Sequence, residues 1–391
     1  QIFLADIWKI SKNSVMIAYQ NLRDELRADS KTRLKIEGFE KIRKHRPDYL
    51  ILLFMGLIML IGVITMYSLS PQRAAFLNKS YGGNYDSMHF FWRQIMSLGL
   101  GLIAFVAMSR VPISWIYRHS GKILAIGFVI CAILAVLGFA KIPPAKCELG
   151  ACRWFKFGSV SVQPSEFLKV GVLIALAVFL GSKAREGKIN DFRETILPSG
   201  LLVGLMLVFI AGFQKDLGTA ISALAIVAFQ FFMAGLNRKN VIAASLIGLV
   251  AIVGMILIAP HRMARVMTFA GNENCSNLSS SEQKDEYHIC HAKIAIGSGG
   301  IFGVGIGNSV QATGYLPEAI NDSVFAILGE TFGFIGLVVI LAIFLALAMR
   351  ILRVATYLKN PASRILAAGV CGWFVFHTIM NVTAMTGLLP L

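Results

Sequence analysis

The stretch that decides the fold is YLILLFMGLIMLIGVITMYSL, residues 49–69, which contains no charged side chain. Its apolar residues fall on every side of a helix rather than at amphipathic spacing. A helix rises 1.5 Å per residue, so a segment of this length spans the ~30 Å hydrocarbon core of a bilayer. The segment predicts a membrane-spanning helix.

Similar apolar blocks recur along the rest of the chain. Hydrophobic residues make up 56% of the sequence and charged residues 15%, whereas a soluble domain carries about 25% charged residues. This composition excludes a soluble globular protein and predicts an all-α, polytopic membrane helix bundle. Nine spans are expected, near 49–69, 90–109, 121–140, 164–182, 196–213, 217–236, 240–259, 322–349 and 363–386.

The net charge of +16 is distributed unevenly. Most Lys and Arg residues lie in segment 1–48 or in loops that alternating spans place on the same side, which predicts a cytoplasmic N-terminus. The charge therefore indicates anionic lipid headgroups, or a docking partner, rather than nucleic acid. We expect a basic cytoplasmic segment (1–48) and a membrane domain (49–391) with a long extracytoplasmic loop at 260–321.

Four cysteines fall in two loops assigned to the outer side. Cys147 and Cys152 share one loop, and Cys275 and Cys290 share the other. Two pairs confined to outer loops suit disulfides in an oxidising compartment, with four free thiols as the alternative.

Two spans open with ionisable side chains. Span four begins Gln163-Pro-Ser-Glu166-Phe-Leu-Lys169, which places Glu166 and Lys169 on one helix face. Charges at membrane depth mark a cavity or a function, unless they form a self-neutralising structural pair. Asp216, which opens span six, is either a functional carboxylate or the N-cap of that helix.

The second half of the long loop is rich in glycine. Residues 297–311 read GSGGIFGVGIGNSVQ, with Ser309 and Gln311 near the end. No strand precedes them, so a dinucleotide site is excluded. The spacing predicts close backbone approach in a segment that dips back towards the membrane.

A carboxylate stands where the long loop becomes span eight. The run Leu316-Pro-Glu318-Ala-Ile-Asn-Asp322 places Asp322 at that junction, one turn after Glu318. Asp322 is either a helix cap or a catalytic group facing the membrane interface.

Four runs, in this order, resemble the SEDS family of peptidoglycan glycan-strand polymerases. They are Gln-Pro-Ser-Glu-x-x-Lys, Asp-Leu-Gly-Thr, Gly-Ser-Gly-Gly…Gly-Asn-Ser-Val-Gln and Leu-Pro-Glu-Ala-x-x-Asp. Their wording is more similar to the FtsW-type than to the RodA-type branch. The chain departs from the family pattern at Lys215, Ile320, Ser323 and Thr331, where Pro, His, a bulky apolar residue and Glu are usual. The first residue is Gln1, and the last apolar stretch runs to Leu391 without the tenth span that is usual in the family, so we expect a fragment trimmed at both ends.

The resemblance implies a peptidoglycan glycosyltransferase of the bacterial cytoplasmic membrane that polymerises lipid II at its outer face, in cell division. It makes Asp322 the general base and allows a divalent cation, Mg or Mn, although no metal ligands are evident. It implies as partners the growing glycan strand, a class B penicillin-binding transpeptidase and other divisome proteins. The alternatives are a lipid-linked precursor flippase and a non-catalytic scaffold. The expected substrate-binding residues are Gln163, Glu166, Lys169, Asp216, Glu318, Ser309 and Gln311, with Arg153, Lys156, Lys215, Arg262 and Arg265 as cations for the diphosphate.

Overall fold

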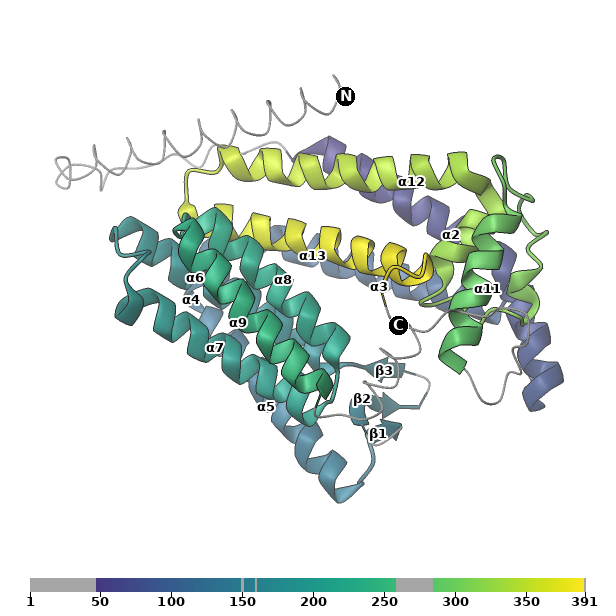
Figure 1. Cartoon of the computed structure of the whole chain (residues 1–391), viewed down its shortest axis with the longest axis horizontal. Coiled ribbons are helices and arrows are strands. Elements are labelled where there is room, and N and C mark those ends of the chain that lie inside the picture. The colour runs from purple at the N-terminus through teal and green to yellow at the C-terminus, as the bar shows by residue number, and fades with distance from the viewer. Residues whose placement is uncertain (1–46, 149–150, 159, 258–283, 390–391) are drawn as a thin grey trace. The chain divides into compact units, whose positions relative to one another are not determined.

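The computed structural model describes residues 47–148, 151–158, 160–257 and 284–389. Within these ranges the chain consists of long helices and one small sheet (Figure 1). The elements are α2 (Tyr49–Tyr81), α3 (His89–Arg110), α4 (Ile113–Arg118), α5 (Ser120–Ala140), β1 (Ala145–Glu148), β2 (Ala151–Phe157), β3 (Val160–Val162), α6 (Pro164–Arg185), η1 (Phe192–Ile196), α7 (Leu197–Leu207), η2 (Val208–Phe213), α8 (Leu217–Ala234), α9 (Arg238–Leu257), α11 (Lys284–Ser298), η3 (Gln311–Thr313), α12 (Val324–Tyr357) and α13 (Pro361–Met385).

Eight helical segments among the described residues are long and apolar enough to cross a membrane. The predicted multi-pass helix bundle is therefore confirmed, with bounds close to those expected from hydropathy. The predicted span 240–259 forms α9, a 20-residue helix, several of whose side chains lie outside the described residues. The main difference is at α2, which continues beyond the predicted end of the first span to Tyr81.

A three-stranded antiparallel sheet, ordered β1-β2-β3, occupies the loop before α6. Hydropathy did not predict it, because its strands are short and lie between two strong helix signals. The sheet matters for the site because β2 carries Arg153 and because β3 leads directly into the start of α6.

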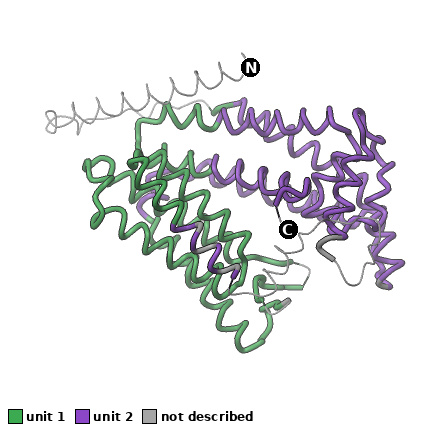
Figure 2. Tube along the Cα trace, in the orientation of Figure 1, with its two compact units in different colours: residues 1–48, 119–246, 351–370 green, residues 49–118, 247–350, 371–391 purple. Residues whose placement is uncertain are grey.

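The chain divides into two compact units (Figure 2). Unit 1 comprises residues 1–48, 119–246 and 351–370. Its centre is α6, whose side chains Leu168, Leu176 and Leu180 are fully buried. Helices α5 and α6 lie close together because a Cβ on Gly127 or Gly171 would sit within about 3 Å of the other helix's backbone.

Unit 2 comprises residues 49–118, 247–350 and 371–391. Its defining feature is a break in α12 at Gly333, whose φ of 67° and ψ of −171° are not helical. The glycine-rich segment pairs with the broken helix, since the amides of Val304 and Gly305 donate to the carbonyls of Glu330 and Thr331. A Cβ on Gly303 would lie 2.3 Å from the Thr331 carbonyl oxygen. The predicted close backbone approach is therefore confirmed, and it satisfies peptide groups that the break releases.

Candidate active site

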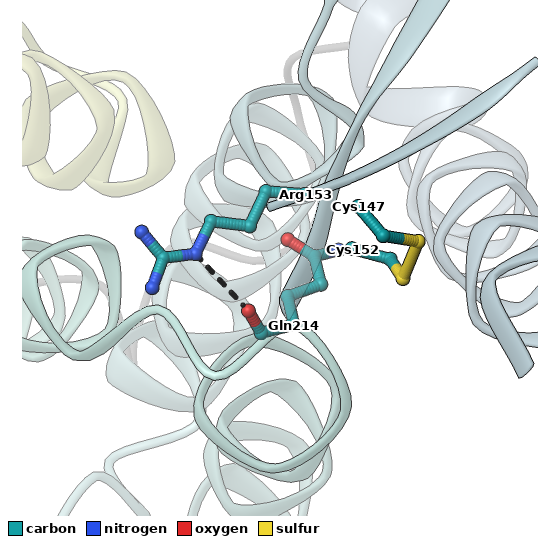
Figure 3. The surroundings of a disulfide bond; sticks show 4 residues. All are labelled: Cys147, Cys152, Arg153 and Gln214. Atoms are coloured by element: carbon teal, nitrogen blue, oxygen red, sulfur yellow. Dashed lines mark hydrogen bonds between the residues drawn. A yellow bond between two sulfur atoms is a disulfide. The ribbon is translucent and has the colours of Figure 1, made fainter. Parts of the chain in front are cut away.

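In unit 1, Arg153 of β2 is hydrogen-bonded to the peptide that precedes α8. Its Nε donates to the carbonyl of Gln214 at 3.2 Å (Figure 3). Its Nη2 donates to the carbonyl of Lys215 at 2.8 Å. Lys215 has a φ of 52°, which a proline ring held near −65° cannot adopt. The chain's departure from the family's proline is thus accompanied by a backbone conformation that excludes proline.

Asp216 is the N-cap of α8. Its carboxylate accepts from the amide of Thr219 at 3.0 Å, from the Thr219 hydroxyl at 2.8 Å and from Gln163 Nε2 at 2.9 Å. These contacts bind the start of α8 to the start of α6 and satisfy an amide donor that the helix leaves unpaired. Of the two roles expected for Asp216, the structure shows the helix N-cap.

Glu166 and Lys169 form an ion pair one helical turn apart, with 2.8 Å between Lys169 Nζ and Glu166 Oε1. The Lys169 side chain is almost fully buried, whereas the Glu166 side chain is 44% exposed. The stem of Lys169 borders a gap among apolar side chains of α6, α7 and α8 that is too narrow for a water molecule. We call Arg153, Gln163, Glu166, Lys169 and Asp216 the α6–α8 cluster.

The remaining residues of unit 1 that the sequence singled out lie close to this cluster in sequence. Cys147 and Cys152 form a disulfide between β1 and β2, at a register where the two residues face each other (Figure 3). Lys156 is exposed on β2, where its amide donates to the carbonyl of Pro144. Cys290 of unit 2 is also disulfide-bonded; its expected partner, Cys275, lies outside the described residues.

In unit 2, Asp322 is exposed in the turn immediately before α12. We call residues 318–323 the carboxylate turn. The turn is closed by the carbonyl of Glu318, which accepts from the amides of Asn321 and Ser323 at 2.9 and 3.2 Å. The carbonyl of Asp322 accepts from Asn381 Nδ2 of α13 at 2.8 Å. Among the described residues, no hydrogen bond or ion pair involves the Asp322 carboxylate, so that carboxylate does not cap α12.

Glu318 holds the turn in an unusual backbone conformation, with a φ of 49°. One oxygen of its carboxylate accepts from Asn321 Nδ2 at 2.6 Å, and the other lies 3.9 Å from Arg73 Nη2 of α2. A non-glycine residue at positive φ is strained by about 1–3 kcal/mol and persists only where its surroundings hold it. These contacts supply that support.

The buried carboxylate of Glu330 holds the loop that contains Ser309 and Gln311, two of the expected substrate-binding residues. Glu330 is 1% exposed and accepts from the Ser309 hydroxyl, from the amide of Val310 at 2.9 Å and from the amide of Gln311 at 3.3 Å. Both residues are therefore held by Glu330. The sequence analysis assigned no role to Glu330; a carboxylate within an apolar span was the available signal.

Two histidines of α11, which sequence reasoning missed, contact this loop and the carboxylate turn. His288 Nε2 lies within hydrogen-bond distance of Ser323 Oγ, and the Ser323 hydroxyl donates to the carbonyl of Pro317 at 2.7 Å. Because that hydroxyl proton is committed, His288 must donate its Nε2 proton to Ser323. His291 Nδ1 lies 2.8 Å from Gln311 Oε1. The pattern His-x-x-His on one helix face was the signal that could have found them.

Tyr287 packs against His291, with 4.2 Å between ring centroids. Burial raises the pKa of Tyr287, and the neighbouring Tyr315 raises it further. The phenol is therefore neutral at pH 7 and available as a hydrogen-bond donor.

The expected site residues thus fall into two groups, each held within its own unit. The α6–α8 cluster and Lys156 belong to unit 1, whereas Asp322, Glu318, Ser309 and Gln311 belong to unit 2. Arg262 and Arg265 lie outside the described residues. No group of three or more His, Cys, Asp or Glu side chains that could hold a metal ion occurs in the described ranges.

Comparisons with known proteins agree on one family. The family model described as "Cell cycle protein", which covers FtsW, RodA and SpoVE, matches residues 48–391. Stage V sporulation protein E of Bacillus subtilis is 33% identical over 350 residues, which cover 89% of this chain and 90% of that protein. A protein of Tolumonas auensis named "Probable peptidoglycan glycosyltransferase FtsW" is 32% identical, with 86% and 83% of the two chains covered.

Solved structures share the fold. A chain from a peptidoglycan synthase complex that coordinates polymerization and crosslinking matches with a TM-score of 0.65 at 20% identity, covering 88% of each chain. The rod shape determining protein RodA of Thermus thermophilus matches with a TM-score of 0.59 at 19% identity, covering 86% of this chain and 84% of that one. The chain therefore belongs to the FtsW/RodA/SpoVE family, the SEDS family that its sequence motifs resemble.

Proposed function

We propose that this protein is a peptidoglycan glycosyltransferase that polymerises lipid II into glycan strands during cell division. Family membership and the names of relatives such as that of Tolumonas auensis support the activity. The observation that carries the assignment of the site is the exposed Asp322 carboxylate, which no described residue pairs with, in a turn held from three helices.

The reaction joins two lipid-linked sugars. A hydroxyl of the acceptor sugar attacks the anomeric carbon of the growing strand; a C–O bond forms there while the bond to the lipid diphosphate breaks. The hydroxyl proton passes to the Asp322 carboxylate, and the diphosphate leaves as an anion. A diphosphate is a better leaving group than the alkoxide released by glycosidases, so a single carboxylate base suffices.

The supporting residues fix that base. A carboxylate acts as a general base only if it lies within hydrogen-bond reach of the proton it removes. Glu318 and Arg73 hold the start of the carboxylate turn, His288 holds Ser323, and Asn381 holds the Asp322 peptide. All of these contacts leave the Asp322 side chain itself unengaged, as a reacting group requires.

The membrane setting follows from charge. We propose that the chain lies in the bacterial cytoplasmic membrane with its basic N-terminal segment in the cytoplasm and Asp322 on the outer side, where the disulfide of Cys147 and Cys152 would persist. A class B penicillin-binding transpeptidase is the proposed partner, because new strands must be crosslinked. The match to a chain from a peptidoglycan synthase complex is in keeping with that partner.

The decisive experiment is polymerisation of purified lipid II by the full protein with a partner transpeptidase whose catalytic serine is removed. Wild type should form glycan strands, and Asp322→Asn should lower the rate by about 10²- to 10⁴-fold with unchanged thermal stability. Asp86→Asn is the matched control. Its carboxylate is also exposed and accepts the amide of Met88 rather than lying in the turn.

Equal rates for wild type and Asp322→Asn would remove Asp322 from the chemistry. Absence of strands from wild type, with passage of labelled lipid II across a proteoliposome membrane, would instead favour a precursor transporter.

A further inference from the structure

Arg73 lies on the part of α2 that extends beyond the predicted membrane span. The 33-residue helix is roughly 50 Å long, whereas the hydrocarbon core is about 30 Å thick. The first predicted span ends at Leu69, so Arg73 stands one turn outside the apolar segment. We place Arg73 near the level of the lipid phosphates, because the hydrocarbon core should end with the apolar segment.

The guanidinium of Arg73 is only partly satisfied by its surroundings. Its side chain is 16% exposed, and within the described part of the chain its ion pair is the 3.9 Å contact to Glu318. Its guanidinium carbon lies 5.7 Å from the ring centroid of Phe76, and its Nε is buried without a hydrogen-bond partner. An arginine has five N–H donors, and buried donors are normally hydrogen-bonded. The Nη2 end of the guanidinium thus faces Glu318, and the Nε donor has no hydrogen-bond partner among the residues that the structure describes.

The contact to Glu318 places Arg73 against the turn that presents Asp322. The carbonyl of Glu318 accepts from residues on either side of Asp322, so Glu318 and Asp322 belong to one tight turn. Arg153, by contrast, belongs to unit 1, where its guanidinium donates to the carbonyls of Gln214 and Lys215.

We propose that Arg73 binds the departing diphosphate of the lipid-linked substrate, with Glu318 orienting the guanidinium; this inference rests on the proposed polymerase function. The chemistry fits. Guanidinium pairs with phosphate oxygens through two parallel charge-assisted hydrogen bonds. A fixed cation stabilises negative charge most where that charge grows as the leaving group departs.

The test measures binding of farnesyl diphosphate to the full protein in detergent, in the Asp322→Asn background so that turnover plays no part. Arg73→Gln should weaken binding by about 10- to 100-fold, as expected for loss of hydrogen bonds to a charged group. The affinity of Arg73→Lys should fall between those of Arg73 and Arg73→Gln, because lysine keeps the positive charge but cannot form the paired hydrogen bonds of a guanidinium. Farnesyl monophosphate should bind more weakly than the diphosphate and depend less on Arg73.

Two controls separate ligand binding from a structural role. Lys79→Gln removes an exposed cation from the same helix extension and should leave affinity unchanged. Glu318→Gln removes the ion pair that orients the guanidinium but keeps the cation, so affinity should fall by less than it does in Arg73→Gln. If Arg73 served only to hold Glu318, the two single variants and the double variant would weaken binding equally.

The outcomes for the two proposals are distinct. No binding of farnesyl diphosphate by the Asp322→Asn protein, or equal binding by its Arg73→Gln derivative, overturns the role of Arg73 even if wild type polymerises lipid II. Arg73-dependent binding by a protein that makes no glycan overturns the polymerase and leaves the diphosphate site standing.

Discussion

In the α6–α8 cluster each charged side chain has a partner within the protein, whereas in the carboxylate turn no described residue forms a hydrogen bond or ion pair with the Asp322 carboxylate. Asp216 caps α8, Arg153 binds two carbonyls, and Glu166 pairs with Lys169. Asp322, by contrast, is supported through its peptide. Polar groups that satisfy one another stabilise a structure, and a group held in place but left unpaired is available for a substrate. Both regions carry family motifs, so the motifs alone do not separate the two roles.

The largest effect should come from Glu330, which supports the loop next to the carboxylate turn. Glu330→Ala would leave the Ser309 hydroxyl and the amides of Val310 and Gln311 without their acceptor. The Ser309 hydroxyl and the Gln311 amide are buried, and each buried unpaired donor costs about 1–3 kcal/mol, so the variant should lose about 2 kcal/mol or more of stability. Unfolding in mixed micelles measures the loss.

Glu330→Gln is the matched control, because it keeps the shape and one acceptor oxygen and should lose less. If Glu330→Ala is as stable towards unfolding as wild type, Glu330 does not hold the loop. The carboxylate turn would then be supported by other residues.

A second experiment tests whether the α6–α8 cluster is structural. Asp216→Ala removes the N-cap of α8 and should cost about 1 kcal/mol. Asp216→Asn should keep the cap, since asparagine caps helices as well as aspartate does, and should retain polymerisation within a few-fold.

The structural role of the α6–α8 cluster would be contradicted if Asp216→Asn kept wild-type thermal stability but lost polymerisation as severely as Asp322→Asn. The carboxylate charge of Asp216, rather than its capping geometry, would then take part in the reaction.

The smallest effect should come from His288. His288→Ala removes the hydrogen bond to Ser323 and should lower kcat by roughly threefold to tenfold, the equivalent of one ordinary hydrogen bond. KM for lipid II should change little, because His288 acts through the turn rather than on the substrate. Steady-state kinetics over a range of lipid II concentrations separate the two parameters.

His288→Gln retains a donor and should recover part of the rate. If His288→Ala acted only through a general loss of packing, the glutamine would not restore the rate. A rise in KM without a fall in kcat would place His288 in contact with substrate instead of behind the turn.

Much of the architecture was predictable because it depends on hydropathy. Apolar blocks such as 49–69 and 363–386 cannot be solvated in water and must satisfy their own peptide groups in a membrane, so helix positions follow from composition. The glycine run 297–311 predicted close backbone approach for a similar local reason. The strands β1–β3 and the extension of α2 to Tyr81 were missed, because short or polar elements give weak periodic signals.

The sequence by itself determined a polytopic helical membrane protein, the family, and Asp322 as the candidate base, since these depend on apolar runs and on ordered local motifs. Only the tertiary structure decided which polar residues are already paired. Asp216 and Arg153 have partners far along the chain, and the contacts of Glu330, His288 and Arg73 are also long-range. Such pairings arise from packing between helices, so residue type and spacing do not specify them.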